Sequence, residues 1–249
     1  MDHRDALITE VNNKLLVVTA DNSAGIGQRP NDIVEADPDL VGALTARVAL
    51  LESVSLGAWP QAVSCTLSFP FATEMGQAVV AGVKGEMSRF NLAETKITGS
   101  SESNFPATVT AVGITVISWV EKSHLLLNKL QENDSIFIIG RPYVGQEVVA
   151  NLSRLPDNQT LKKLTALAGL HEVIPCGSQG IRAELQRLTE NNGWSITEQH
   201  HCSIDLTKSA GPASCLIAIG ELDYQTLSSR LSEPVNYVGY LRRKNEKNI

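Results

Sequence analysis

Three acidic side chains lie where expected strands or helices of the first half of the chain end, namely Asp21, Glu52 and Glu102. Carboxylate oxygens in such positions suit Mg²⁺, which is usually shared between one or two carboxylates and the phosphates of a nucleotide. Gly25 and Gly27 follow Asp21 closely, and glycines let backbone N–H groups approach a phosphate. The combination indicates a phosphoryl-transfer site. The spacing alone fits ordinary caps and turns equally well, so both interpretations stay open.

The common nucleotide-binding motifs are missing from the sequence. No Gly-x-x-x-x-Gly-Lys-Ser/Thr occurs, and "AGIGQRP" has only the first two glycines of Gly-x-Gly-x-x-Gly, which disfavours a dinucleotide site. A second small-residue turn, "CGSQGI" at residues 176–181, precedes an expected helix. The N-terminus of that helix can bind an anion or can simply be capped.

Apolar patterns place these motifs on a series of alternating strands and helices. The first series has strands expected at residues 14–20, 62–69 and 108–120, and helices expected after Asp37-Pro38 and at 75–90. A second series of strands and helices follows, and "DSIFIIGRPYVGQEV" is expected to close the first. The alternation predicts an α/β (α+β) fold of two domains, a mixed-sheet domain at residues 1–147 and an α/β domain at residues 148–249.

Bulk composition excludes several classes of protein. The 249 residues carry a net charge of −6, with 21 basic and 27 acidic residues spread along the chain, so a nucleic-acid surface is not expected. No apolar run reaches the roughly 18 residues of a membrane span, and the N-terminus lacks a signal-peptide pattern. We therefore expect a cytoplasmic protein. His200, His201 and Cys202 are adjacent in an expected edge strand, where they would face alternate sides and not one metal ion.

Four segments in order resemble a known superfamily. They are "VVTADNSAGIG", "ARVALLESVSLGAWPQAV", "KITGSSESNFP" and "AVGITVISWV". The order is similar to the ATP-binding superfamily of aminoimidazole ribonucleotide synthetase, thiamin-monophosphate kinase, selenophosphate synthetase and a hydrogenase maturation protein. Its members share a strand ending in Thr-Asp, a helix ending "Asp-x-x-x-x-Gly-Ala-x-Pro" and a "Gly-Gly-Glu/Asp-Thr" loop. These features correspond here to Asp21, to Glu52 through Pro60, and to the segment around Glu102.

The resemblance implies a Mg²⁺ and ATP site with a small-molecule acceptor. Asp21, Glu52 and Glu102 would bind the metal ion, and the first domain would pair with its copy through its sheet in a homodimer. Arg47 would add positive charge, although a salt bridge is an equal interpretation. Asp32 or Glu102 would act as general base, and Asn104 would orient the acceptor, although an ordinary turn is an equal interpretation of Asn104. The residues expected to contact ATP are Asn22, Gly25, Gly27, Arg47, Gly99, Gly177, Ser178 and Gly180.

The sequence also departs from the superfamily pattern. Glu52 replaces the usual aspartate, we expect the glycine and aspartate leader to be missing, and "GSQG" stands where relatives carry "Asp-Gly-Gly-Leu". The segments "DNSAGIG", "ARVALLE", "TGSSESNFP" and "PCGSQGIR" resemble most closely the compact α-ribazole kinase type of cobalamin salvage, which implies phosphorylation of the 5′-hydroxyl of α-ribazole. Two alternatives stay open: another ATP-dependent phosphotransferase or ligase of the superfamily, and a nucleotide-binding dimer without catalysis.

Overall fold

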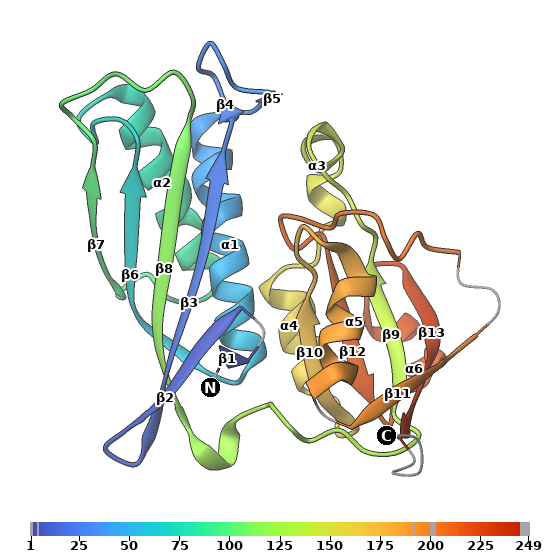
Figure 1. Ribbon diagram of the computed structural model, residues 1–249. Coiled ribbons are helices and arrows are strands. Elements are labelled where there is room, and N and C mark those ends of the chain that lie inside the picture. The colour runs from blue at the N-terminus through green and yellow to red at the C-terminus, as the bar shows by residue number, and fades with distance from the viewer. Residues whose placement is uncertain (1, 4, 192, 200–202, 245–249) are drawn as a thin grey trace. The chain divides into compact units, whose positions relative to one another are not determined.

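The protein divides into two compact units, Met1–Leu125 and Leu126–Ile249, in a computed structural model (Figure 1). The structure describes residues 2–3, 5–191, 193–199 and 203–244. The strand expected at His200, His201 and Cys202 falls outside these ranges. Among the described helices, none combines the length and apolar character that crossing a membrane requires.

The first unit is built on a six-stranded sheet with the order β1-β2-β3-β8-β6-β7. Only the β6–β7 pair is parallel, so the sheet is mixed, as the sequence predicted. A short parallel pair, β4 and β5, lies in the loop after β3. The strands are β1 Asp2–His3, β2 Ala6–Val11, β3 Lys14–Ala24, β4 Ile26–Gly27, β5 Val34–Glu35, β6 Trp59–Leu67, β7 Lys96–Ser101 and β8 Ala111–Glu121, and a short 3₁₀ helix, η1, follows at Lys122–His124.

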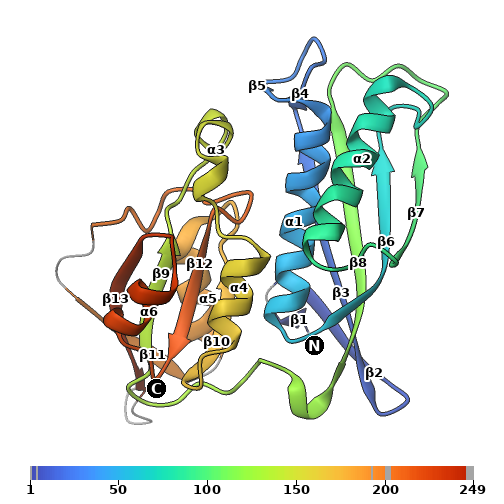
Figure 2. The ribbon, with the colours of Figure 1, turned by 180° about the vertical axis from the view of Figure 1, so that it is seen from behind.

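Two helices, α1 (Pro38–Ser55) and α2 (Glu74–Arg89), cover one face of this sheet (Figures 1 and 2). Helix α1 begins at the expected proline, but Asp37 does not cap it through its side chain. The Asp37 carboxylate instead accepts a hydrogen bond from Gln28 Nε2 at 3.0 Å, which ties the preceding loop to the start of the helix.

Buried hydroxyl groups fix the position of α1 on the sheet. Thr19 Oγ1 on β3 donates to the Ala49 carbonyl oxygen at 2.7 Å, and Ser53 Oγ lies 2.5 Å from Ser118 Oγ on β8. Because side chains alternate along a strand, the face of β3 that carries Thr19 toward α1 also carries Asp21. Asn22, the next residue, belongs to the opposite, open face.

The hairpin formed by β2 and β3 was missed by the sequence analysis. Its turn is Asn12 and Asn13, which have φ values of 49° and 64°. Two adjacent residues with positive φ are the mark of a type I′ hairpin turn, in which asparagine is favoured. The hairpin adds a strand on the far side of β3, and β3 itself runs past its expected end at residue 20 to Ala24.

The second unit contains a five-stranded, fully antiparallel sheet with the order β10-β12-β9-β13-β11. Strand β9 pairs with β12 on one side and β13 on the other. The segment expected to close the first domain is therefore the central strand of the second unit, and the units divide about twenty residues before the expected boundary at 147. The elements are β9 Ser135–Gly140, α3 Gln146–Ala150, η2 Leu152–Arg154, α4 Asn158–Thr165, β10 Leu170–Pro175, α5 Gly180–Asn191, β11 Trp194–Glu198, β12 Cys215–Gly220, α6 Tyr224–Arg230 and β13 Val235–Arg243.

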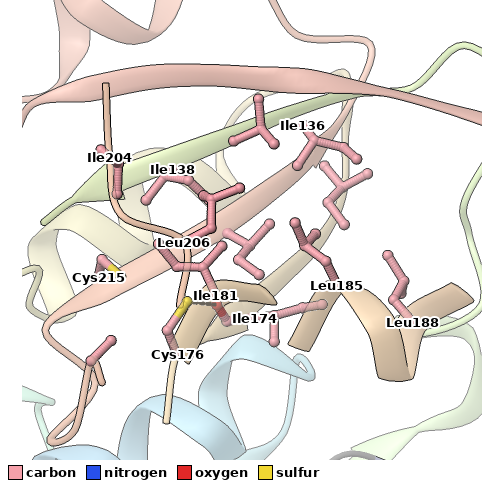
Figure 3. Close-up of a cluster of buried hydrophobic side chains, with 14 of the residues drawn as sticks. Ile136, Ile138, Ile174, Cys176, Ile181, Leu185, Leu188, Ile204, Leu206 and Cys215 are labelled. Atoms are coloured by element: carbon pink, nitrogen blue, oxygen red, sulfur yellow. Dashed lines mark hydrogen bonds between the residues drawn. The ribbon is translucent and has the colours of Figure 1, made fainter. Parts of the chain in front are cut away.

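Apolar side chains of α5 pack against this sheet in a buried cluster (Figure 3). Ile181 and Leu185 of α5 lie in the same cluster as Ile136 and Ile138 of β9 and Ile174 of β10. The intervening β9 residues are also buried, so β9 is covered on both faces. Burial on both faces explains why its sequence is apolar throughout and shows no alternation.

Helices α1 and α2 approach each other closely because glycine occupies the contact. A Cβ atom on Gly82 would overlap the carbonyl oxygen of Asp39, whereas a Cβ atom on Gly85 would have no neighbour within 4 Å. The two glycines lie three residues apart on one helix, so they form a matched pair for testing this packing.

We predict opposite effects of alanine at these two positions. Gly82→Ala forces the helices apart and should lower the free energy of unfolding by about 1–3 kcal/mol. Gly85→Ala should raise it by roughly 0.5–1 kcal/mol, because alanine restricts the unfolded chain more than glycine does. Urea unfolding followed by circular dichroism measures both, and equal effects would contradict the close contact.

Candidate functional site

The glycine loop after β3 folds back onto the start of β8. The Gly25 N–H donates to the Thr110 carbonyl at 2.9 Å, and the Gly25 carbonyl accepts from the N–H groups of Ile33 and Val34. Gly25 has φ +73° and no atom within 4 Å of the place where a Cβ would be, whereas a Cβ on Gly27 would overlap Thr110 Oγ1. Gly27 is therefore required by packing, and Gly25 leaves open space beside the backbone.

Asp32 holds this loop in place. Its Oδ1 accepts the Thr110 N–H at 2.8 Å, and its Oδ2 accepts the Thr110 hydroxyl at 2.7 Å and the Arg29 N–H at 2.8 Å. Partial burial would raise the pKa of Asp32, but the hydrogen bonds from Thr110 and Arg29 outweigh it and lower the pKa below its ordinary value. Both oxygens are already used, so the geometry is that of a residue that positions the loop.

Asp21 lies on the covered face of β3 with a raised pKa. Burial is the main cause and brings the pKa from 3.8 to about 6, the Asn22 N–H lowers it, and the negative charge of Asp5 raises it further. Asp5 directly precedes β2, whose register pairs Ala6 with Thr19. Two carboxylates thus interact beside the end of β3. Asp5 was not among the predicted residues, because finding it depends on recognising the β2–β3 hairpin.

Glu52 and Arg47 are buried within α1, with 7% and 4% of their surfaces exposed. Both interact with other groups of the protein. The neighbour of Glu52, Ser53, contacts Ser118, which lies opposite Val17 on β3. Val17 is four residues from Asp21, a separation of about 13 Å along a strand. The structure therefore does not place Glu52 beside Asp21.

Glu102 follows the end of β7 and is exposed. Its Oε1 accepts the N–H groups of Asn104 at 2.6 Å and Phe105 at 3.3 Å. The hydrogen bond from the Asn104 backbone is the main reason that the pKa of Glu102 is lowered. This carboxylate is therefore ionised at neutral pH, and it stabilises the turn in which Asn104 lies.

The three predicted metal ligands do not form one cluster in a single chain. Strands β3 and β7 are separated by β8 and β6, and three strand spacings correspond to about 14 Å. Within the described ranges, no group of three or more histidine, cysteine, aspartate or glutamate side chains is arranged to hold a metal ion. Of the carboxylates discussed, Asp5 is the one whose charge acts on Asp21.

A cavity of about 510 Å³ lies between α2 and β7, and Gly99 is one of its lining residues. Gly99 is needed there, because a Cβ would overlap the Cys65 carbonyl oxygen. Burial raises the pKa of the Cys65 thiol to about 11, so the thiol is neutral. Lys84 is the cationic residue at this cavity. Its lining consists of Cys65, Phe71, Gln77, Val80, Ala81, Lys84, Ile97, Thr98 and Gly99.

The small-residue turn of the second unit precedes α5 as expected. The Gly180 N–H donates to the Gly177 carbonyl at 3.1 Å, as does the Ala210 N–H at 3.2 Å. Gly180 has φ +81°, and a Cβ there would lie 2.6 Å from the Lys208 carbonyl oxygen. Ser178 is exposed at this turn. The backbone is thus tightly fixed at the N-terminus of a 12-residue helix.

Comparison with known proteins identifies the fold. No family model matches the chain, and neither does any curated protein. Among solved structures, AaThiL complexed with AMPPCP and TMP matches with TM-score 0.64 at 13% identity, over 97% of this chain and 85% of that chain. Thiamine-monophosphate kinase from Stenotrophomonas maltophilia K279a matches with TM-score 0.62 at 16% identity, over 98% and 90%.

A protein from another process has the same architecture. The HypE–HypF complex matches with TM-score 0.64 at 13% identity, over 95% of this chain and 87% of that chain. These matches confirm the predicted mixed α/β fold of two units, the fold of the aminoimidazole ribonucleotide synthetase-like proteins.

We predict that Asp21→Asn stabilises the protein above pH 6 when no metal ion is present. Between about pH 4 and pH 6, the folded protein keeps a proton on Asp21 that the unfolded chain has released, so stability falls as pH rises through this window. Asp21→Asn does not lose stability in this way, so its free energy of unfolding at pH 7 should exceed that of the wild type by about 1–3 kcal/mol. Thermal unfolding from pH 3.5 to 8 measures the difference.

Glu94→Gln is the matched control, since Glu94 is an exposed carboxylate of the same unit. Mg²⁺ should raise the melting temperature of the wild type and not of Asp21→Asn. An identical pH dependence in all three proteins would rule out the raised pKa of Asp21.

Proposed function

We propose that the protein is an ATP-dependent kinase that phosphorylates the 5′-hydroxyl of a small nucleoside-like acceptor. The observation that carries the proposal is the cavity beside Gly99, which lies in a fold shared with a protein that binds AMPPCP. The predicted residue Gly99 is at its wall, and the predicted residue Glu102 follows three positions later at the end of the same strand.

The cavity has the chemistry of a nucleotide site. Phe71, Ile97 and the neutral Cys65 supply apolar walls for a planar base, while Lys84 supplies a positive charge for phosphate. Sites for small ligands are commonly apolar with a few polar groups and occupy about 300–1,000 Å³. The adenine of ATP would therefore lie between α2 and β7.

The acidic residues fit Mg²⁺ in part. Burial is the main reason that the pKa of Asp21 is raised to about 6, and the negative charge of Asp5 adds to it. Asp21, with Asp5 beside it, would hold the ion, which would offset the negative charge of the β- and γ-phosphates. A single chain keeps Glu52 and Glu102 at a distance from Asp21, so we do not assign them to this ion. Their role as metal ligands stays a prediction.

The remaining predicted residues have positioning roles in this proposal. Asp32 fixes the loop that carries Gly25, whose surroundings leave room for phosphate beside the backbone near Asn22. Gly177 and Ser178, at the N-terminus of α5, would contribute backbone N–H groups to a phosphate. Arg47 is buried in α1, so its charge would act from within the protein.

Glu102 is our candidate for the general base, because it is exposed and ionised. Its lowered pKa makes it a weak base, so positioning and charge stabilisation would supply most of the catalysis. The backbone N–H of Asn104 donates a hydrogen bond to the Glu102 carboxylate. The side chain of Asn104 would orient the acceptor hydroxyl.

We propose α-ribazole as the acceptor on the basis of the sequence resemblance. Thiamin monophosphate is the alternative acceptor suggested by the structural matches. A nucleotide-binding protein without catalysis is the second candidate function, favoured by the separation of Asp21, Glu52 and Glu102.

We predict ADP release from ATP and Mg²⁺ that depends on the acceptor. The purified protein is incubated with α-ribazole, with thiamin monophosphate or with neither, and the product is checked by mass for one added phosphate. Asp21→Asn should abolish turnover. Tight ATP binding without ADP release for any acceptor would instead support the non-catalytic function.

Lysine variants test the cavity within the same assay. Lys84→Ala should raise the KM for ATP by about tenfold, the size expected for losing a charged contact to phosphate. Lys96→Ala is the matched control, because Lys96 is an exposed lysine on β7 that does not line the cavity. Equal effects of the two changes would place ATP elsewhere.

We also propose a homodimer formed through the open face of the first unit's sheet. Leu7, Trp59 and Ile117 have 49%, 52% and 37% of their surfaces exposed. Strand pairing places all three on the face opposite α1, since Leu7 pairs with Val18 and Ile117 pairs with both Val18 and Ala62. A contiguous exposed apolar surface of this kind typically marks an interaction site.

Sedimentation velocity tests this dimer. The wild type should sediment at about twice the chain mass of 26.9 kDa, and Ile117→Lys should give the monomer because it buries a charge in the interface. Val144→Lys is the control, since Val144 is a 44% exposed valine in the second unit. A monomeric wild type would exclude the dimer.

A further inference from the structure

A second cavity, of about 430 Å³, lies within the second unit and is lined mostly by polar side chains. It is formed where three segments meet: the loop after β9, the short helix η2 and the loop between α6 and β13. None of its residues belongs to the proposed ATP site. The side chains that matter for its chemistry are Arg141, Tyr143, Ser153, Arg154, Ser232 and Glu233.

The two arginines of this cavity lack partners in the part of the chain that the structure describes. Neither Arg141 nor Arg154 forms an ion pair or a side-chain hydrogen bond there. Other arginines of the same unit do: Arg182 pairs with Glu198, and Arg187 pairs with Glu184 at 3.1 Å. Two guanidinium groups at one cavity, neither of them paired with a carboxylate, repel each other, so an anionic ligand would be favoured there.

The one carboxylate at the cavity is engaged elsewhere. Glu233 Oε1 accepts a hydrogen bond from the Thr160 hydroxyl of α4, and Oε2 accepts one from Ser232 Oγ at 3.3 Å. It forms no ion pair with Arg141 or Arg154 among the described contacts. The local balance of two positive charges against one negative charge contrasts with the net charge of −6 of the chain.

Backbone hydrogen bonds hold the lining segments in fixed positions. The Gly140 N–H donates to the Pro234 carbonyl at 2.8 Å, which joins the end of β9 to the loop before β13. The Tyr143 N–H donates to Ser214 Oγ at 2.8 Å, and Ser214 is fully buried. The backbone that carries Arg141 and Tyr143 is thus ordered before any ligand binds, which lowers the entropic cost of binding.

We propose that this cavity binds the phosphate group of a small phosphate monoester. A guanidinium presents a planar pair of donors that matches phosphate oxygens, and the hydroxyls of Ser153 and Tyr143 can donate to the remaining oxygens. The Tyr143 ring and the size of the cavity leave room for a sugar beside the phosphate. The proposal does not depend on the kinase function.

Ligand-observed NMR titration of the full chain with ribose 5-phosphate tests the proposal. The wild type should bind ribose 5-phosphate in a saturable manner and more tightly than ribose or malonate. Arg141→Ala and Arg154→Ala should each weaken binding by about tenfold. Arg141→Lys and Arg154→Lys should give intermediate losses, because lysine keeps the charge but lacks the paired donors.

Lys129→Ala is the matched control, since Lys129 is an exposed cation of the same unit outside the cavity. It should bind as the wild type does, and melting temperatures should agree among all variants because Arg141 and Arg154 are exposed. The proposal is overturned if the wild type shows no saturable binding, if malonate binds as tightly as ribose 5-phosphate, or if the arginine variants behave like Lys129→Ala.

Discussion

The register of α1 on β3 and β8 determines which side chains of the first unit can do chemistry. The hydrogen bond from Thr19 to Ala49 and the contact of Ser53 with Ser118 allow only one alignment of helix and sheet. Side chains on a strand alternate, so this alignment turns Asp21 toward the helices and leaves Ile117 on the open face. The raised pKa of Asp21 and the exposed apolar surface are therefore two consequences of the same packing.

The two glycines of the loop after β3 have different surroundings. Gly27 is dictated by packing, because Thr110 and Asp32 occupy the space that a side chain would need. Gly25 is different: its N–H is bound to Thr110, yet the space beside it is empty. A turn that is rigid on one side and open on the other can receive a ligand without losing further backbone entropy. The same loop thus serves as a turn, and the space beside Gly25 is where the proposed function would place a phosphate.

Most helices and strands were predictable, but their neighbours in the sheets were not. Periodicity located α2 and β8 within a few residues, because each buries one face or stripe. It could not show that β8 inserts between β3 and β6, which separates Asp21 from Glu102. Strand β9 was assigned to the wrong side of the division between units, because a strand buried on both faces has no pattern that reveals its partners. The contact of Gly99 with Cys65, which shapes the cavity, is likewise a long-range feature.

Both units place like charges at one site. In the first, burial and then the charge of Asp5 raise the pKa of Asp21; in the second, Arg141 and Arg154 line one cavity without an acidic partner among the described contacts. Selection for stability alone would remove such repulsion, since exchanging either residue of a pair relieves it. Ligands of opposite charge, a cation at the carboxylates and a phosphate at the arginines, would turn each repulsive pair into a source of binding energy. The charge distribution is therefore better explained by what each unit binds than by what holds it folded.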